Sequence, residues 1–242
     1  MHYRDDLTHI HHQGFSEFAE SAAPGVLALL ARQGLRGGHV VEIGCGTGIL
    51  ARELTRAGST VTGVDLSQSM IELARTTAPG VSFSVGSFDT VAIPPCDAVV
   101  AMGEVLNHGT FAGVRTFVAH AAEALRPGGL LLFDVAERSP VAAREETRLG
   151  GDDWSVIAIN ESDGRTLRRR VLTFRRIGEE IRRDEERHDL ELYDRGEVLS
   201  LLREHAFRVQ VRRSYGTIRL PKGHAVYMAL TPGTGAPKKP QH

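Results

Sequence analysis

The sequence predicts an α/β fold: a doubly wound, mostly parallel sheet with an antiparallel last strand, plus an antiparallel β insertion after strand five. Three observations support this prediction. From residue 24 to residue 135, short apolar runs alternate with helical segments, which is typical of a parallel sheet covered on both faces. A glycine-rich loop, residues 44–48, joins the first strand to a helix. From residue 151 onward, long strand-like segments are separated by hairpin signals.

The core, residues 24–150, is expected to contain five strands and four helices. Short apolar runs indicate buried strands, and apolar residues at helical spacing indicate helices. Pro24 suits the first turn of a helix, Gly34 suits its end, and Ser67 can cap a later one. The predicted strands are 39–43, 60–65, 81–86, 96–102 and 130–135, and the predicted helices are 24–34, 49–58, 67–76 and 111–125.

The β insertion, residues 151–193, is predicted to be an antiparallel meander with hairpin turns at Asp163-Gly164 and Gly178-Glu179. Its three strands are expected at 154–160, 165–177 and 180–193. Residues 194–231 are expected to complete the core with a helix and a closing pair of strands, at 196–206, 207–215 and 224–230. The tail, residues 232–242, is rich in Pro, Gly and Lys and is expected to be disordered.

The composition limits the class of protein. Hydrophobic residues make up 41% of the chain and charged residues 24%, which is ordinary for a globular protein in water. A net charge of −1 argues against a general polyanion-binding protein. The chain shows neither a secretory signal nor an apolar run near the roughly 20 residues of a membrane span. Its two cysteines, Cys45 and Cys96, form no metal-type pair and no disulfide framework. We expect a cytoplasmic protein with no membrane partner.

The glycine-rich loop is the motif that carries the chemistry. Its glycines allow a sharp turn and let a ligand approach the main chain, while the next helix points its N-terminal amides at that ligand. The spacing is G-x-G-x-G; a dinucleotide fingerprint would need glycine at Ile49. Asp65 closes the second predicted strand, 17 residues after Gly48, where a carboxylate can accept hydrogen bonds from a ribose diol. A tight strand-to-helix turn without a ligand is the alternative.

At these residues the chain resembles the class I S-adenosylmethionine-dependent methyltransferases of the small-molecule type. The resemblance covers residues 24 to 135 and is carried by VVEIGCGTG, VTGVDLSQSMIELAR, VSFSVGSFD and ALRPGGLLLFD. It implies a Rossmann-like fold, S-adenosyl-L-methionine as the cofactor, no metal, and a small-molecule methyl acceptor.

The resemblance also assigns cofactor-binding residues. Glu42 would lie near the methionine ammonium, Asp65 would hold the ribose hydroxyls, and Tyr3 would cover the cofactor as part of a lid formed by residues 1–23. The remaining expected contacts are Gly44, Cys45, Gly46, Gly48, Met102 and Gly103 at the methionine portion, and Leu66, Met70, Ser87 and Phe88 at the adenine. Two alternatives stay open: Met70 as plain helix core, and Asp89 as a displaced substitute for an acid at Ser87.

Catalytic candidates follow from the position of polar groups at the carboxyl ends of the strands, where ligands bind in open α/β sheets. His108 can remove a proton near neutral pH, and Glu104 can bind the ammonium, orient the acceptor or cap the next turn. His11 and His12, in the predicted lid, are further candidates facing the acceptor. There are two alternatives to a catalytic role. These histidines are surface residues, or His9 and His12 form a chance zinc site.

Residues 165 to 187 contain nine arginines. They indicate either a nucleic-acid surface or, as we favour, the wet face of a meander balanced by acidic residues on adjacent strands. The insertion resembles the lid of amino-sugar N-methyltransferases and glycine N-methyltransferase, which covers the substrate or mediates dimerisation. Trp154, Arg168, His188 and Tyr193 are candidates to face the acceptor, and a homodimer is an expected option.

The leading prediction is a methyltransferase acting on N or O of a small molecule by in-line displacement. The alternatives are an RNA or protein methyltransferase docking through the arginine-rich insertion, and a non-catalytic S-adenosylmethionine-binding protein. A nicotinamide oxidoreductase is disfavoured by Ile49 at the third glycine position.

Overall fold

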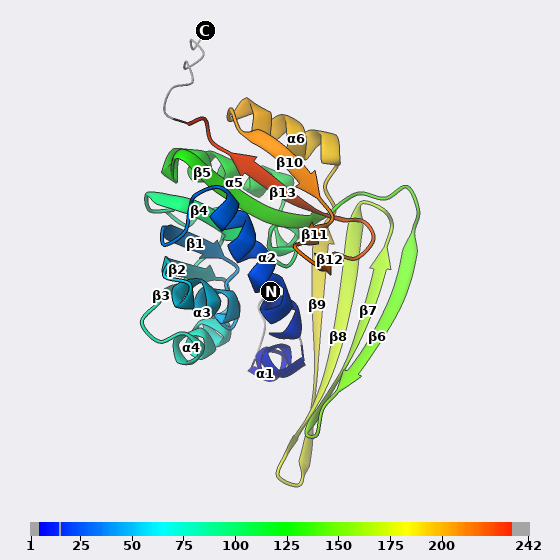
Figure 1. Cartoon of the computed structure of the whole chain (residues 1–242). Coiled ribbons are helices and arrows are strands. Elements are labelled where there is room, and N and C mark those ends of the chain that lie inside the picture. The colour runs from blue at the N-terminus through cyan, green and yellow to red at the C-terminus, as the bar shows by residue number, and fades with distance from the viewer. Residues whose placement is uncertain (1–4, 15, 234–242) are drawn as a thin grey trace.

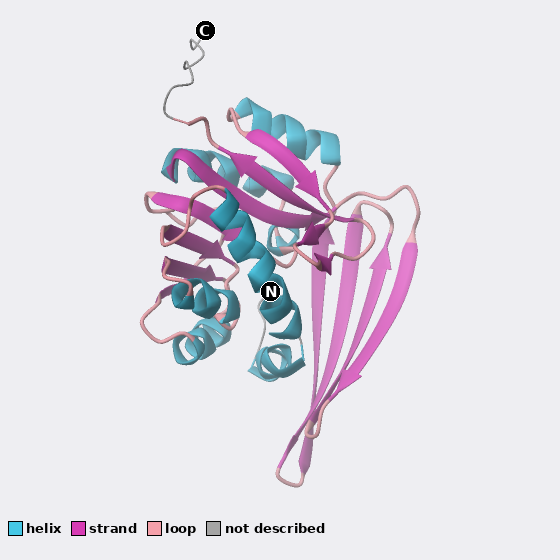
Figure 2. Cartoon of the chain, in the orientation of Figure 1, coloured by secondary structure: helices cyan, strands magenta, loops and turns pink. Residues whose placement is uncertain are grey.

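The computed structural model describes residues 5–14 and 16–233. Its core is a seven-stranded sheet with helices on both faces, and a four-stranded antiparallel sheet stands beside it (Figures 1 and 2). The core sheet has the order β3-β2-β1-β4-β5-β13-β10. Its strands are β1 (His39–Ile43), β2 (Thr60–Asp65), β3 (Ser82–Val85), β4 (Cys96–Ala101), β5 (Leu125–Ala136), β10 (Arg208–Arg212) and β13 (His224–Leu230).

The sheet is parallel except at β13, which runs antiparallel to both β5 and β10. The order reverses between β1 and β4, where an open α/β sheet has its ligand-binding crevice. These features confirm the predicted fold class.

Helices cover the two faces with separate apolar clusters. On one face pack α2 (Ser16–Arg32), α3 (Ile49–Arg56) and α4 (Gln68–Thr77). On the other pack α5 (Phe111–Ala124) and α6 (Arg195–Glu204). The central strands are buried on both faces, which explains why they read as continuous apolar runs in the sequence.

Several elements differ from the sequence prediction. The helix expected at 24–34 begins at Ser16, so Pro24 lies inside α2. A further helix, α1 (Asp5–Gly14), precedes it. The strand expected at 130–135 extends over Leu125–Ala136. A two-stranded ribbon, β11 (Ser214–Tyr215) and β12 (Ile218–Arg219), also replaces the end of the strand expected at 207–215.

The antiparallel sheet has four strands in the order β6-β7-β8-β9, not three. They are β6 (Ala143–Gly150), β7 (Trp154–Ser162), β8 (Thr166–Ile177) and β9 (Glu180–Glu191). The additional strand, β6, lies at the edge and falls within the range that the sequence assigns to the core. Its side chains are almost all exposed and half of them are charged, so it lacks the apolar alternation that marks a half-buried strand.

Helix α1 packs against the inner face of this sheet. Leu7 and Ile10 of α1 form an apolar cluster with Trp154, Val156 and Val171. The Trp154 indole donates a hydrogen bond to Gln13 Oε1 at 3.0 Å, and a side chain at Gly14 would clash with the same ring. Helix α1 is therefore docked on the insertion through both apolar and polar contacts (Figure 1).

The arginines of the insertion lie mostly among acidic partners. Arg144 pairs with Glu161 across strands, Arg148 pairs with Glu146, and Arg183 and Arg187 both reach Glu185. In β8 and β9, however, Arg170 lies opposite Arg187 and Arg175 lies opposite Arg182, so the predicted charge balance across these strands is incomplete. Among the described residues, no helix is long and apolar enough to cross a membrane.

Candidate active site

The glycine-rich loop leaves β1 at the sheet edge and leads into α3. Gly44 and Gly46 have φ of 67° and 51°, in the left-handed region that favours glycine. A side chain at Gly44 would clash with Val105, whereas a Cβ at Gly46 would meet no atom within 4 Å. The loop is thus packed against the segment after β4 on one side and open on the other, where a ligand can approach the backbone.

Two carboxylates flank this loop. Asp65, at the end of β2, accepts hydrogen bonds from the amides of Gly46 and Ser67, both at 2.9 Å. Glu42, at the end of β1, is 3% exposed, and within the described chain its Oε2 has no hydrogen-bond partner. Burial, and then the charge of Asp65, raise the pKa of Glu42 well above its usual range. A buried carboxylate oxygen without a partner is a position that a cationic ligand group would satisfy.

The other residues predicted to bind the cofactor divide into two kinds. Leu66 is 43% exposed at the end of β2 and can lie against a ligand. Met70 is buried in α4, Cys45 is buried with its thiol towards Gly63, and the Phe88 ring packs on Phe117. These three side chains are buried, and their contacts with the cofactor stay predictions.

Ser87 follows β3 and donates its hydroxyl hydrogen bond to Asp89, so the two residues that the sequence offered as alternatives contact each other. Met102 packs on the core cluster, and Gly103 follows it with φ of 93°. Tyr3 lies outside the described residues. Within the predicted lid, residues 1–23, the structure describes α1 and the start of α2, and their role as a lid stays a prediction.

The histidines of α1 lie next to the glycine-rich loop. His12 Nδ1 is 3.1 Å from the Thr47 hydroxyl, which joins α1 directly to this loop. His11 is adjacent to His12, and burial lowers its pKa to about 4, so its ring is neutral near pH 7. His9 pairs instead with Asp153 of the insertion at 3.9 Å. Across the described chain, histidines, cysteines and carboxylates form no group that could hold a metal ion.

A second group of polar residues lies after β4. Asp134, buried in β5, accepts hydrogen bonds from the amides of Gly103 and Glu104, at 2.7 and 3.0 Å, and from the Tyr215 hydroxyl at 2.7 Å. These bonds fix a turn in which Glu104 has a left-handed φ of 60°, rare for a residue other than glycine. The side chain of Glu104 makes no capping hydrogen bond to the next turn, η1 (Val105–His108), so the capping alternative is wrong.

Glu104 is held as an anion by two cations. Arg169 of β8 approaches its oxygens at 3.3 and 3.4 Å, and His224 of β13 lies 3.5 Å away. Burial alone would raise the pKa of Glu104, but His224 and Arg169 outweigh it and lower the pKa to about 2. In turn, although burial opposes it, Glu104 raises the pKa of His224. The result is a charged triad that joins the core to the insertion.

His108 lies at the end of η1, with its ring edge-on to His188 of β9 and the ring centroids 5.7 Å apart. It keeps an exposed edge. Desolvation by the surrounding protein, and then Arg169, lower the pKa of His108. Burial, His108 and Arg169 lower the pKa of His188 to about 4. Both rings are therefore neutral near pH 7 and able to accept a proton or a hydrogen bond.

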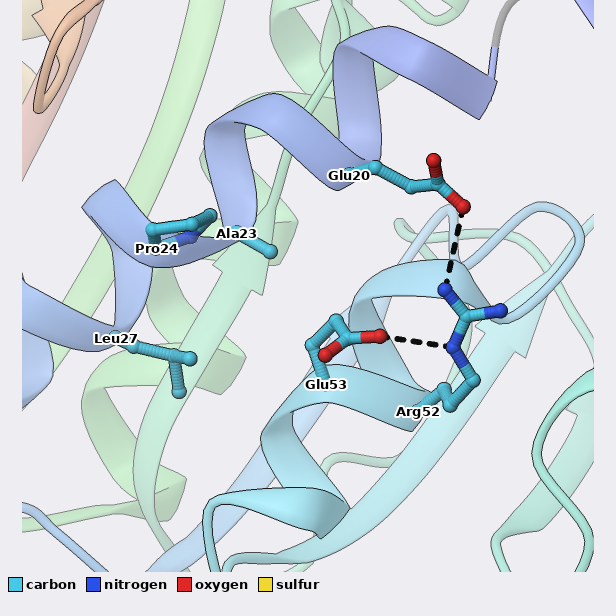
Figure 3. A pocket seen from close by; sticks show the side chains of 6 residues that line it. All are labelled: Glu20, Ala23, Pro24, Leu27, Arg52 and Glu53. Carbon is cyan, nitrogen blue, oxygen red and sulfur yellow. Dashed lines mark hydrogen bonds and ion pairs between the residues drawn. The ribbon is translucent and has the colours of Figure 1, made fainter.

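A surface hollow between α2 and α3 is a different feature. Its lining includes Arg52, which bridges Glu20 at 3.3 Å and Glu53 at 2.8 Å (Figure 3). Its lining includes no residue of the glycine-rich loop, so it does not belong to the candidate site.

Comparisons with known proteins identify the core. Residues 40–129 match the model of a family described as a methyltransferase domain. This segment is similar to a methyltransferase domain. The matched segment includes the glycine-rich loop, Asp65 and the turn after β4, and it ends near the start of β5.

Curated relatives agree with this similarity. The chain is 31% identical over 110 residues to a ubiquinone biosynthesis O-methyltransferase of Coxiella burnetii, a match that covers 43% of this chain and 46% of the relative. The chain thus spans about half the length of the curated relatives it matches.

Solved structures match the fold over nearly the whole chain. A S-adenosylmethionine-dependent methyltransferase from Clostridium acetobutylicum is similar with a TM-score of 0.80 and 18% identity, covering 93% of this chain and 97% of the other. CalS10, an amino pentose methyltransferase from Micromonospora echinaspora, is similar with a TM-score of 0.76 and 20% identity, covering 95% and 98%. The predicted resemblance to methyltransferases is therefore confirmed.

The predicted catalytic residues lie in two places. His12 contacts the glycine-rich loop and His11 is its neighbour in α1, whereas Glu104 and His108 meet the insertion. Sequence reasoning missed Arg169 and His224, the partners of Glu104. It named Arg168, which is exposed on the opposite face, because strand register cannot be read from a segment that is arginine-rich on both faces.

The other insertion residues named as acceptor contacts have separate roles. Trp154 contacts α1, and the Tyr193 hydroxyl bonds the carbonyls of Leu106 and Gly109. Of the four candidates, His188 alone lies beside a predicted catalytic residue of the loop after β4.

Proposed function

We propose that this protein is a S-adenosyl-L-methionine-dependent methyltransferase that transfers a methyl group to N or O of a small molecule. One observation carries the proposal: the Asp65 carboxylate and the unpartnered Glu42 oxygen flank an open glycine-rich loop. This donor set matches the ligand's parts, since Asp65 can accept from a ribose diol and Glu42 can accept from an ammonium. When bound, the cofactor supplies an electrophilic methyl group on a sulfonium.

The chain's own residues supply placement and a dry environment. The Gly46 backbone lets the ligand approach closely, and Leu66 offers an apolar surface for a base. Helix α1 and the insertion together form the proposed lid, in which His12 contacts Thr47 over the loop. Holding two reactants in line within about 3 Å accounts for much of the rate of such a displacement.

On the acceptor side, Glu104 and His108 have different proposed roles. Glu104 stays ionised, so it orients an acceptor ammonium or hydroxyl instead of removing its proton. His108 is neutral near pH 7, so a ring nitrogen can take the proton that an N–H or O–H nucleophile must lose. His12 is less suited to this role, because it contacts the glycine-rich loop rather than the loop after β4.

Isothermal calorimetry with S-adenosylmethionine and S-adenosylhomocysteine tests the cofactor proposal. Asp65→Asn should weaken binding about 10- to 100-fold, because a hydrogen bond to a charged group is worth about 1.5–3 kcal/mol. Asp163→Asn, in the exposed turn between β7 and β8, is the matched control, because its carboxylate also accepts from two backbone amides; the affinity should change by less than about threefold. Absence of binding by the wild-type chain at millimolar cofactor would contradict the proposal.

The acceptor class is tested by turnover. We would incubate the chain with S-adenosylmethionine and separate panels of amino sugars, catechols and short RNA, and follow S-adenosylhomocysteine formation. Methylation of a small amine or hydroxyl supports the proposal. Methylation of RNA with steep salt dependence would favour the docking alternative, and binding without turnover on any panel would favour a non-catalytic binding protein.

We further propose a cytoplasmic homodimer formed through the outward face of the insertion. Trp154, Val156 and Val171 face α1, so the strand register directs Ile157, Leu172 and Phe174 to the opposite face, where they are half-buried among arginines. Phe174→Glu should convert the dimer to a monomer in sedimentation experiments, whereas Thr76→Glu on α4 should not. A wild-type chain that is monomeric at all concentrations would reject the proposal.

A further inference from the structure

Asn107 is a fully buried residue of η1. Its side chain uses both N–H donors and one of the two lone pairs of its carbonyl oxygen in hydrogen bonds. Its Nδ2 donates to the carbonyls of Ala136 at 3.0 Å and Glu191 at 2.6 Å. Its Oδ1 accepts from the Ala136 amide at 2.9 Å. This pattern needs two donors and one acceptor in a planar group, which among side chains of this size only asparagine supplies.

The two residues that Asn107 bonds, Ala136 and Glu191, lie at the two ends of the insertion, which we call its roots. Ala136 is the last residue of β5, just before the chain leaves the core, and Glu191 is the last residue of β9, just before the chain returns. A second tie lies beside it, since the Tyr193 hydroxyl is 2.7 Å from the Leu106 carbonyl and 2.8 Å from that of Gly109. The segment Leu106–Gly109 is therefore fastened to both ends of the insertion.

The residues on either side of Asn107 are the ones that meet the insertion. Glu104 contacts Arg169, and His108 lies against His188. Their partners belong to β8 and β9, which reach the core through the roots that Asn107 holds. The position of Glu104 and His108 relative to Arg169 and His188 thus depends on the hydrogen bonds that join the loop after β4 to the base of the insertion. We call these bonds the joint.

We propose that Asn107 is a positioning residue that locks the loop after β4 to both roots of the insertion, so that Glu104 and His108 meet the acceptor side in one fixed geometry. The inference rests on the proposed methyltransferase function. Asn107 itself is buried among backbone groups and does not face a ligand. It acts through Glu104 and His108, and its loss should affect acceptor methylation more than cofactor binding.

The test compares Asn107→Ser with the wild-type chain. Serine retains one hydroxyl and cannot bridge both carbonyls and the amide. We expect the affinity for S-adenosylhomocysteine to change by less than about threefold, and kcat/KM for a methyl acceptor found by the turnover assay to fall by about 10-fold or more, since small misplacements at a reacting centre are costly. Equal losses in cofactor affinity and turnover would overturn the proposal, because they indicate general damage.

A second readout needs no acceptor. His188 is buried against His108, with Arg169, Glu186 and Asp189 as the charged neighbours on its own sheet, and its pKa is about 4. If the joint opens, water reaches this ring and its pKa should rise toward the ordinary 6.5 in Asn107→Ser, measured by NMR titration with His188→Gln for assignment. An unchanged titration in a folded variant would overturn the proposal.

Two further variants keep the test decisive. Asp97→Asn alters a carboxylate that bonds the His39 amide and Arg126 at the opposite edge of the sheet. It should lower the melting temperature without moving the His188 titration. Should Asn107→Ser not fold, Tyr193→Phe cuts the neighbouring tie and should move the titration in the same direction; no movement would overturn the proposal. The titration can be read without ligand, so failure to bind cofactor would count only against the proposed function.

Discussion

The ion pairs of Glu104 predict a specific pH dependence of stability, which the variant Glu104→Gln exposes. The side chain is 19% exposed and its pKa lies at about 2 instead of the ordinary 4.5. A tenfold change in proton affinity is worth about 1.4 kcal/mol, so ionised Glu104 contributes about 3 kcal/mol to the free energy of unfolding at neutral pH. Because the folded pKa is lowered, this contribution is present above pH 4.5 and is lost as the pH falls toward 2.

Urea unfolding of the wild-type chain and of Glu104→Gln at pH 5 and pH 3 measures this contribution. His11 and His188, whose pKa values are about 4, titrate in both chains, so their contributions cancel in the comparison and the difference comes from Glu104. The wild-type chain should lose about 2 kcal/mol more than the variant between the two pH values. The control is Glu161→Gln, whose partner Arg144 is also exposed, and for which the pH-dependent difference should stay under about 0.5 kcal/mol.

A difference between wild type and Glu104→Gln that is the same at pH 5 and pH 3 would refute this reasoning. It would mean that Arg169 and His224 do not favour the ionised form over the protonated one. Glu104 would then be an acid of ordinary strength, and its role as a permanent anion on the acceptor side would fall with it.

Three further predictions concern neighbouring contacts. Asp6, 6% exposed between Arg175 and Arg182, holds α1 on the insertion; Asp6→Asn should shift the emission of Trp154, the single tryptophan, to longer wavelength, and unchanged emission would count against a latch. The charge of His224 stabilises the chain below pH 6.5, and this is lost as the pH rises through its raised pKa, so His224→Gln should flatten the stability profile above pH 6.5 in calorimetry. Tyr215→Phe removes a hydrogen bond to buried Asp134 and should cost about 1.5–3 kcal/mol in urea unfolding; a neutral effect would contradict that bond.

Much of the core could be predicted from the sequence because its strands are buried on both faces. Runs such as residues 96–101 and 130–135 have no alternative to a buried strand between turn signals, and the structure has strands there. Helix α1 was missed because only Leu7 and Ile10 supply its apolar face, and their partners Trp154, Val156 and Val171 are far away in the sequence. Strand β6 was missed because pairing with β7, not burial, defines it.

The candidate site was predictable to a similar degree. The glycine-rich loop and Asp65 depend on local strand-to-helix geometry, which a motif records. The partners of Glu104 do not depend on local geometry, because Arg169 and His224 reach it from two other strands. Choosing Arg169 over Arg168 requires the register of β8 against β9, where a shift of one residue exchanges the two faces of the sheet.

The base of the insertion has a consequence for how such proteins diversify. Glu137 and Tyr193, at which the chain leaves and re-enters the core, are paired in a β-bridge. The two ends of the intervening segment are therefore in contact, as in a domain that can be inserted or exchanged without disturbing the rest of the fold. A different segment grafted between these points would leave the sheet order intact. We expect chimaeras cut here to keep the nucleoside site of the recipient while taking on the acceptor preference of the donor.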